Sequence, residues 1–353
     1  MGLCFLITAM MLSRVADHQY WMSRQIERAE NLARLVRVSE EILLDDETLG
    51  RGSAQEYWSP VLQATAMEES FRNLYPVPRQ GDAARFITSD LRNPDSMISC
   101  IRQARENARS VRDKISEEMW TEINALNMFV TSPEGIDMLD MAPQAFYEKI
   151  ISSSMLFDGI TEATLTRDEG WNFLQLGRLL ERADMTSRFL DIRSQTKAAD
   201  DAQESLQWGA VLRACGAHTG YRRAHGGEIS IEKVVDLLLF SNEFPRSVRH
   251  CLRRADEVLH DISGTPTGGY SNQCEKLTGA VLARLSFAGP NEVMAIGLHT
   301  YIDGLQKHLN AASQAVFESF VLLPNEINRH VPNRSRQDSF SDWQREQQQQ
   351  QQQ

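Results

Sequence analysis

Apolar residues recur at helical spacing along nearly the whole chain. Between Ser13 and about Asp45, successive apolar positions are separated by steps of four, three, four and three residues, as in Met22, Ile26, Ala29, Ala33 and Val36. That spacing places them in one stripe on a helix of 3.6 residues per turn. Alternating Val, Ile and Thr, which would indicate strands, are rare, and only 11 prolines occur in 353 residues. The pattern predicts an all-α protein built as a multi-helix bundle.

The same period returns between polar and proline-containing breaks. We expect further helices near residues 58–64, 98–115, 117–130 and 142–165, with Ser132-Pro133-Glu134-Gly135 as a break between the last two. Thr166 and Glu169 stand at capping-box spacing before another apolar run. The helix expected there repeats the steps of the first long helix, through Leu176, Leu180, Ala183, Ser187 and Leu190.

One charged motif occurs twice, once on each of these two long helices. The first copy is Arg24-Gln25-Ile26-Glu27-Arg28-Ala29-Glu30 followed by Arg34, and the second is Arg178-Leu179-Leu180-Glu181-Arg182-Ala183-Asp184 followed by Arg188. Two further blocks also repeat, around Trp58 and Trp208 and around Pro94 and Pro245. Three ordered blocks at nearly constant displacement indicate two homologous halves, about 13–150 and 166–325, packed about a pseudo-twofold axis. A period this long indicates domain duplication rather than a solenoid.

The two ends of the chain differ from this helical region. Residues 1–10 are mostly apolar, but no basic segment precedes them, no small-residue cleavage site follows them, and they are too few to span a bilayer. We interpret them as a non-native or upstream extension, with Met11 as the start. We expect one helical domain over 11–331. The polar segment 332–353, which ends in seven glutamines, is expected to be disordered.

The charged motif residues are the candidates for a structural or functional site: Arg24, Glu27, Arg28, Glu30, Arg34, Arg178, Glu181, Arg182, Asp184 and Arg188. One interpretation is a buried or half-buried ion-pair network where the motif helices meet their neighbours, because arginine and carboxylate groups pair bidentately. Another is a polar groove, lined by Glu27, Arg28, Glu181 and Arg182, that holds a zwitterionic or carboxylate-bearing ligand such as a peptide end. The third interpretation is that the motif residues are ordinary surface charges. Only Glu27 and Glu181 are candidates for acid/base catalysis.

Composition narrows the function further. The formal net charge of −11 removes the broad basic footprint of nucleic-acid binding and argues against anionic membrane surfaces. Five scattered cysteines without a CxxC pair favour reduced thiols in the cytoplasm, and Cys100 and Cys251 are expected to be small core residues. No glycine-rich phosphate loop, zinc-type spacing or serine-nucleophile elbow is present. We therefore expect no cofactor and no metal.

Several segments resemble the alpha-E family, bacterial proteins predicted to be helical and named for a Glu-Arg motif. They are Met11-Leu12-Ser13-Arg14-Val15-Ala16, Tyr20-Trp21-Met22, Asp168-Glu169-Gly170-Trp171, Phe244-Pro245-Arg246-Ser247-Val248 and the two Glu-Arg motifs. The resemblance covers about residues 11–331. The resemblance implies that such proteins are encoded beside, or fused to, ATP-grasp-type ligases and transglutaminase-like peptidases. It therefore implies that the chain has an accessory role in peptide ligation or modification. It supplies no catalytic residues.

Three hypotheses follow. The first is a non-catalytic helical accessory protein that binds an ATP-grasp-type ligase or its peptide product. The second is an enzyme with a Glu/Arg site between the two halves, and the third is a stand-alone helical scaffold. The sequence leaves the ligand, the partner and the oligomeric state open.

Overall fold

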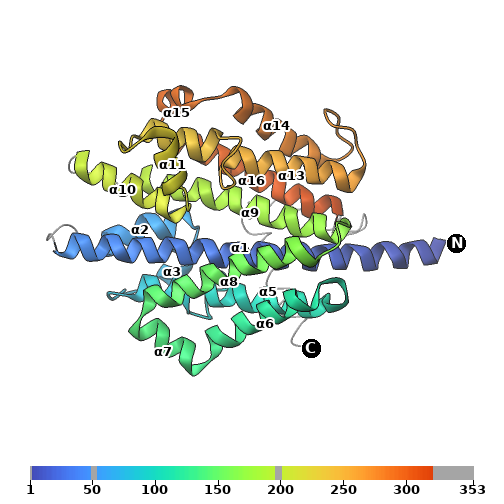
Figure 1. The fold of residues 1–353 in the computed structure, drawn as a ribbon, viewed down its shortest axis with the longest axis horizontal. Helices are drawn as coiled ribbons and strands as arrows, with labels where there is room; N and C mark the ends of the chain where they lie inside the picture. The colour runs from blue at the N-terminus through green and yellow to red at the C-terminus, as the bar shows by residue number, and fades with distance from the viewer. Residues whose placement is uncertain (1, 49–53, 195–200, 321–353) are drawn as a thin grey trace.

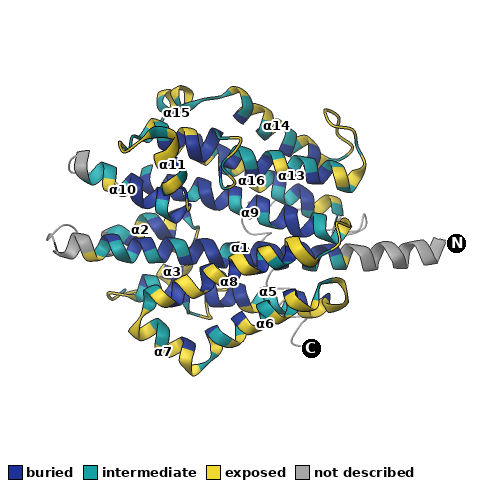
Figure 2. Cartoon of the chain, viewed as in Figure 1, coloured by how far each residue is buried: buried dark blue, intermediate teal, exposed yellow. Residues whose placement is uncertain are grey.

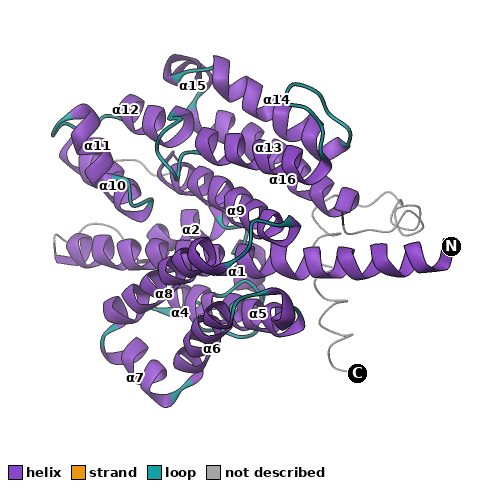
Figure 3. Ribbon diagram, turned by 45° about the vertical axis from the view of Figure 1, so that its right-hand side comes forward, coloured by secondary structure: helices purple, strands orange, loops and turns teal. Residues whose placement is uncertain are grey.

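The computed structural model describes residues 2–48, 54–194 and 201–320. These residues form helices and contain no strand, which confirms the all-α prediction (Figure 3). The helices are α1 (Gly2–Thr48), α2 (Ala54–Ala64), α3 (Glu68–Leu74), α4 (Asp82–Thr88), α5 (Met97–Ser110), η1 (Arg112–Lys114), α6 (Glu117–Thr131), α7 (Pro133–Met141), α8 (Pro143–Thr164), α9 (Glu169–Ser194), α10 (Asp201–Ala214), α11 (His218–His225), α12 (Ile231–Val235), η2 (Asp236–Phe240), α13 (Val248–Ser263), α14 (Gln273–Phe287), α15 (Pro290–Ile296) and α16 (Leu298–Phe320).

The two long motif helices, α1 and α9, pack against each other through the middle of the bundle (Figure 1). Helices α5 and α8 pack against α1, and α13 and α16 pack against α9. Helix α6 contacts both α5 and α8, and α14 contacts both α13 and α16. Two further helices cross over, since α2 packs on α9 and α10 packs on α1. Neighbours therefore surround α1 and α9, so that even polar side chains on them are buried (Figure 2).

The predicted apolar stripes form the core of this arrangement. Met22 and Ile26 of α1 and Leu176 and Leu180 of α9 are at most 2% exposed. The helices also approach closely at Gly177, where an added Cβ would lie 2.3 Å from the backbone oxygen of Tyr20. Only a residue without a side chain fits at this crossing. The backbone contact at Gly177 thus fixes how α9 lies on α1.

Helix α1 is longer than the sequence pattern predicted. It runs from Gly2 to Thr48 instead of from Ser13 to about Asp45. No proline interrupts this stretch and no glycine follows Gly2 in it, so nothing local ends the helix near Ser13. The predicted disordered segment 332–353 lies outside the described residues.

Two helix starts also differ from the prediction. Ser132 does not open an extended break. Its side chain accepts a hydrogen bond from the backbone N–H of Gly135 and caps α7, with proline in the first turn, where no N–H is needed. Helix α9 begins at Glu169, and Asp168 rather than Thr166 supplies the cap, because its Oδ1 accepts from the N–H of Trp171 at 3.1 Å.

Candidate functional site

The two Glu-Arg motifs pair with each other across the α1–α9 contact. Glu181 accepts from Arg28, with Nε 2.6 Å from Oε1 and Nη2 3.1 Å from Oε2, and also from Nε of Arg24 at 2.6 Å. In the opposite direction, Glu27 accepts from Arg182, with Nε 3.0 Å from Oε1 and Nη2 2.6 Å from Oε2. Each glutamate is therefore held in a two-bond pair by the arginine of the other motif, the strongest geometry for this kind of contact.

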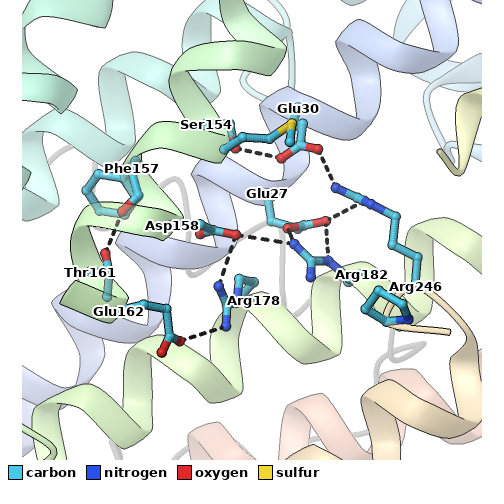
Figure 4. A network of polar contacts seen from close by, with 12 residues as sticks. Glu27, Glu30, Ser154, Phe157, Asp158, Thr161, Glu162, Arg178, Arg182 and Arg246 are labelled. Carbon is cyan, nitrogen blue, oxygen red and sulfur yellow. Dashed lines mark hydrogen bonds and ion pairs between the residues drawn. The ribbon is translucent and has the colours of Figure 1, made fainter. Parts of the chain in front are cut away.

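The network continues along α1 through a residue outside the motifs, Arg246 (Figure 4). Arg246 lies just before α13 and donates to Glu27 at 2.9 Å and to Glu30. Glu30 is 0% exposed and also accepts from Nε of Arg34 and from the hydroxyl of Ser154, both at 2.8 Å. Three donors from three parts of the chain therefore hold this buried carboxylate.

On the other side, α8 contributes a carboxylate between two motif arginines. Asp158 lies 3.0 Å from Nη1 of Arg178 and 3.3 Å from Nη2 of Arg182 (Figure 4). Arg178 also reaches Glu162, near the end of α8, at 3.4 Å. Ion pairs therefore connect α8 to α9, although the sequence pattern did not predict an acidic motif on α8.

Each carboxylate of this network is paired with at least one guanidinium group. One cluster pairs four carboxylates with five guanidinium groups, namely Glu27, Glu30, Asp158 and Glu162 with Arg34, Arg167, Arg178, Arg182 and Arg246. The other pairs Glu181 and Asp95 with Arg24 and Arg28. Buried charges persist only when they are paired and hydrogen-bonded. We call these two clusters together the Glu-Arg brace.

The brace keeps both motif glutamates ionised. Burial alone would raise the pKa of Glu181, but the charges of Arg28 and Arg24 outweigh it and lower the pKa to about 2. Burial is likewise outweighed at Glu27, whose pKa Arg182 and Arg246 hold well below its usual range. Both side chains are only 1% exposed. Neither carboxyl group is therefore placed to exchange a proton with a substrate near neutral pH.

Five of the ten predicted site residues meet at the α1–α9 contact: Arg24, Glu27, Arg28, Glu181 and Arg182. Arg178 turns instead to Asp158 and Glu162. The remaining four form pairs within a helix at i,i+4, Glu30 with Arg34 and Asp184 with Arg188. Arg188 also donates to the backbone oxygen of Ala64, at the end of α2.

Five brace residues are not among the predicted site residues: Asp95, Asp158, Glu162, Arg167 and Arg246. Two of them occupy the same position of a repeated block, in Pro94-Asp95-Ser96 and Pro245-Arg246-Ser247. Their charges are opposite, so the position looked variable, although the block itself marked it. For Asp158 the sequence carried no comparable signal.

A pocket of about 390 Å³ opens beside the brace, at the junction of α8, α9 and α13. Its wall is mainly basic and partly apolar, with Arg167, Arg178, Arg182, Arg254, Trp171 and Leu179 among the lining residues. Of the four residues expected to line a ligand groove, only Arg182 contributes to this pocket. Glu27, Arg28 and Glu181 are enclosed in the brace instead.

The sequence profile of a family described as a predicted alpha-helical domain with a conserved ER motif matches residues 11–321. The chain belongs to the Alpha-E family. The resemblance seen in the sequence is thereby confirmed. In this Alpha-E chain, the dipeptides Glu27-Arg28 and Glu181-Arg182 form the cross-paired centre of the brace.

Curated relatives of this Alpha-E chain are longer proteins. Over 310 residues it is 24% identical to Uncharacterized protein Mb2597 of Mycobacterium bovis and 23% identical to Uncharacterized protein Rv2567 of Mycobacterium tuberculosis. The match covers 84% of this chain and 34% of each relative. The chain thus spans about a third of the length of the curated relatives it matches. No solved structure matches it.

The two cysteines of the repeated blocks lie in the core of this Alpha-E chain. Cys100 and Cys251 are fully buried, and burial raises the pKa of the Cys251 thiol to about 12, which confirms that they are core residues. Within residues 2–48, 54–194 and 201–320, no group of three His, Cys, Asp or Glu side chains is placed to hold a metal ion. None of the helices described in these ranges has the length and apolar character needed to cross a bilayer.

Proposed function

We propose that this Alpha-E chain is a non-catalytic helical accessory protein of an ATP-grasp-type peptide ligation or modification system, and that it binds the ligase or its peptide product. The family resemblance suggests the system. The observation that carries the non-catalytic part is the enclosure of Glu27 and Glu181, each 1% exposed and paired with two arginines.

An acid/base catalyst needs a pKa near the working pH and a position within hydrogen-bond reach of the substrate. Glu181 is ionised far below neutral pH, and both of its oxygens already accept from arginines. Glu27 is held in the same way by Arg182 and Arg246. The alternative, an enzyme with a Glu/Arg site between the halves, would need one of these glutamates as its acid or base, and arginines already hold both of them.

We also propose that the chain consists of two homologous halves, about 13–150 and 166–325, related by a pseudo-twofold axis between α1 and α9. Corresponding helices have corresponding neighbours: α1 with α5 and α8, α9 with α13 and α16, and α2 and α10 each with the opposite long helix. The reciprocal pairs Arg28–Glu181 and Arg182–Glu27 are what such an axis would produce. In this proposal the brace locks the halves into one rigid platform for a partner.

The greater length of the relatives supports the proposal that the Alpha-E region is a module that works together with other domains or proteins. In both mycobacterial proteins, the matched region is 34% of the whole. An accessory role would use such a region together with a ligase or peptidase, either in the same polypeptide or as a separate partner.

Affinity purification of the tagged chain from its native cells tests the proposal. We expect an ATP-grasp-type ligase or a transglutaminase-like peptidase to be recovered, and recovery of neither would refute the assignment to this system. Glu181→Gln tests the non-catalytic part, with Tm and the activity of the reconstituted system measured together. We expect activity to fall only as far as the folded fraction falls. Loss of activity at unchanged Tm would favour the enzyme hypothesis.

A further inference from the structure

The pocket beside the brace is basic although the protein is acidic. Four arginines and one carboxylate, that of Glu162, line it, in a chain whose formal net charge is −11. Asp158 and Glu257, which pair with arginines of this pocket, are not among its lining residues. A concave site rimmed by one sign of charge attracts ligands of the opposite sign. The pocket therefore favours an anion.

The remaining wall of the pocket is apolar, and the pocket volume limits the size of the molecule that bears the anionic group. Trp171, Leu179 and Pro245 contribute apolar surface, and the guanidinium of Arg167 lies 4.3 Å over the Trp171 ring. A volume of about 390 Å³ is at the lower end of small-ligand sites. This combination suits an anionic group attached to a short apolar body, rather than a bare inorganic ion.

A carboxylate of the chain itself already occupies part of the pocket. Glu162 accepts from Nη2 of Arg167 at 2.8 Å and from the amide of Gln175 at 3.0 Å, with Arg178 at 3.4 Å. Its side chain is 42% exposed, so it can turn aside. These donors are thus arranged for a carboxylate. Within the described part of the chain, Nε of Arg178 and Nε1 of Trp171 are buried without a hydrogen-bond partner.

We propose that this pocket binds the C-terminal carboxylate of a peptide, with the peptide's last side chain lying against Trp171 and Leu179. In this proposal Arg254, Arg182 and Arg167 lie around the carboxylate, and Glu162 competes with it for Arg167. The identity of the ligand as a peptide rests on the function proposed above. The pocket's preference for a carboxylate on an apolar body rests on its own lining.

Isothermal titration calorimetry of the full chain tests the ligand class with three probes: acetyl-Ala-Leu with a free carboxylate, the same dipeptide as its C-terminal amide, and inorganic phosphate. The free acid should bind at least about tenfold more tightly than the amide, because charge-assisted hydrogen bonds are lost with the carboxylate. Equal affinity of acid and amide, or no binding of either, would overturn the proposal. Phosphate that binds as tightly as the dipeptide would show a general anion site and overturn it too.

Two variants with opposite expected effects locate the site. Arg254→Gln should weaken the free acid about tenfold, whereas Glu162→Gln should tighten it by removing the competing carboxylate. Arg253→Gln is the matched control, because Arg253 also pairs with Glu257 on α13 but does not line the pocket. All three side chains are at least 35% exposed, so the fold should persist, as circular dichroism melting would verify. Unchanged affinity in Arg254→Gln, or weaker binding in Glu162→Gln, would contradict the assignment.

The two proposals fail separately. Recovery of the ligase with no carboxylate preference in the titration refutes the pocket and leaves the accessory role intact. A carboxylate preference that follows the Arg254 and Glu162 variants, without an ATP-grasp or peptidase partner, supports the pocket and refutes the assigned system.

Discussion

Replacing Glu181 by glutamine should destabilise the protein strongly while preserving its shape. The change keeps the volume and one acceptor oxygen but removes the negative charge between Arg24 and Arg28. Arg28 retains Asp95, whereas Arg24, whose side chain is 6% exposed, has Glu181 as its carboxylate partner among the described residues. Glu181→Gln therefore leaves an uncompensated buried guanidinium.

The structure sets the size of the effect. Removing one member of a buried ion pair costs about 3–5 kcal/mol, most of it from the charge left behind. Because glutamine still accepts one hydrogen bond, we expect the lower end, about 3 kcal/mol of unfolding free energy. For a chain of this length that corresponds to a fall in Tm of roughly 4 °C.

Urea unfolding followed by circular dichroism measures this difference. Asp303→Asn on α16 is the matched control, because Asp303 forms an i,i+4 pair with Lys307 at 2.7 Å and both side chains are more than half exposed. It should change the unfolding free energy by no more than about 0.5 kcal/mol. If Glu181→Gln is as mild as Asp303→Asn, then the brace does not hold the two long helices together.

The same pair predicts a pH dependence. The pKa of Glu181 is lowered from its ordinary value of 4.5 to about 2 on folding, by the charges of Arg28 and Arg24 against the effect of burial. A lowered folded-state pKa gives stability that is complete above the unfolded pKa and lost as pH falls through the folded one. The difference between wild type and Glu181→Gln should therefore narrow between about pH 5 and pH 2. A difference that widens on acidification would refute the ion-pair explanation.

Four further substitutions test three other parts of the structure by urea unfolding. Gly177→Ala should lower the free energy of unfolding by about 1–3 kcal/mol, because the added methyl group clashes at the α1–α9 crossing. Gly159→Ala on α8, where an added Cβ meets no atom within 4 Å, should raise the free energy of unfolding by about 0.5–1 kcal/mol. Equal effects of the two substitutions would refute the close approach at Gly177. Burial raises the pKa of Asp17 from 3.8 to about 7, so the ionised side chain destabilises the folded state increasingly as pH rises from about 4 to 7. Asp17→Asn should therefore be more stable than wild type at pH 8, by up to about 4 kcal/mol, with the gain vanishing near pH 4. A gain independent of pH would contradict the titration. Arg246→Gln removes one of the guanidinium groups from two buried glutamates and should cost about 3 kcal/mol, while a neutral effect would place Arg246 outside the brace.

The sequence predicted the helices well because helical period depends on local pattern. The stripe through Met22 and Ile26 and its counterpart through Leu176 and Leu180 are both buried as expected. The prediction failed where a local signal has two meanings. Ser132 followed by proline fits a break and equally fits the capped start of a helix, and only the structure decides between them.

The candidate site was predicted in its composition but not in its connections. The motif spacing identified Glu27 and Glu181 together with their arginines. A helical wheel gives the face of the helix on which each residue lies, but it does not give the side chain of the neighbouring helix that the residue contacts. Asp158 and Arg246 come from separate segments that only tertiary packing brings to α1 and α9. The basic pocket likewise joins residues of α8, α9 and α13, so no sequence window contains it.

A double-mutant cycle between Arg28 and Glu181 tests the cross-pairing of the two motifs most directly. The unfolding free energies of wild type, Arg28→Gln, Glu181→Gln and the double variant give the coupling between two residues 153 positions apart. The reciprocal pairing predicts a favourable coupling of about 1–3 kcal/mol. Effects that simply add, to within about 0.5 kcal/mol, would contradict it.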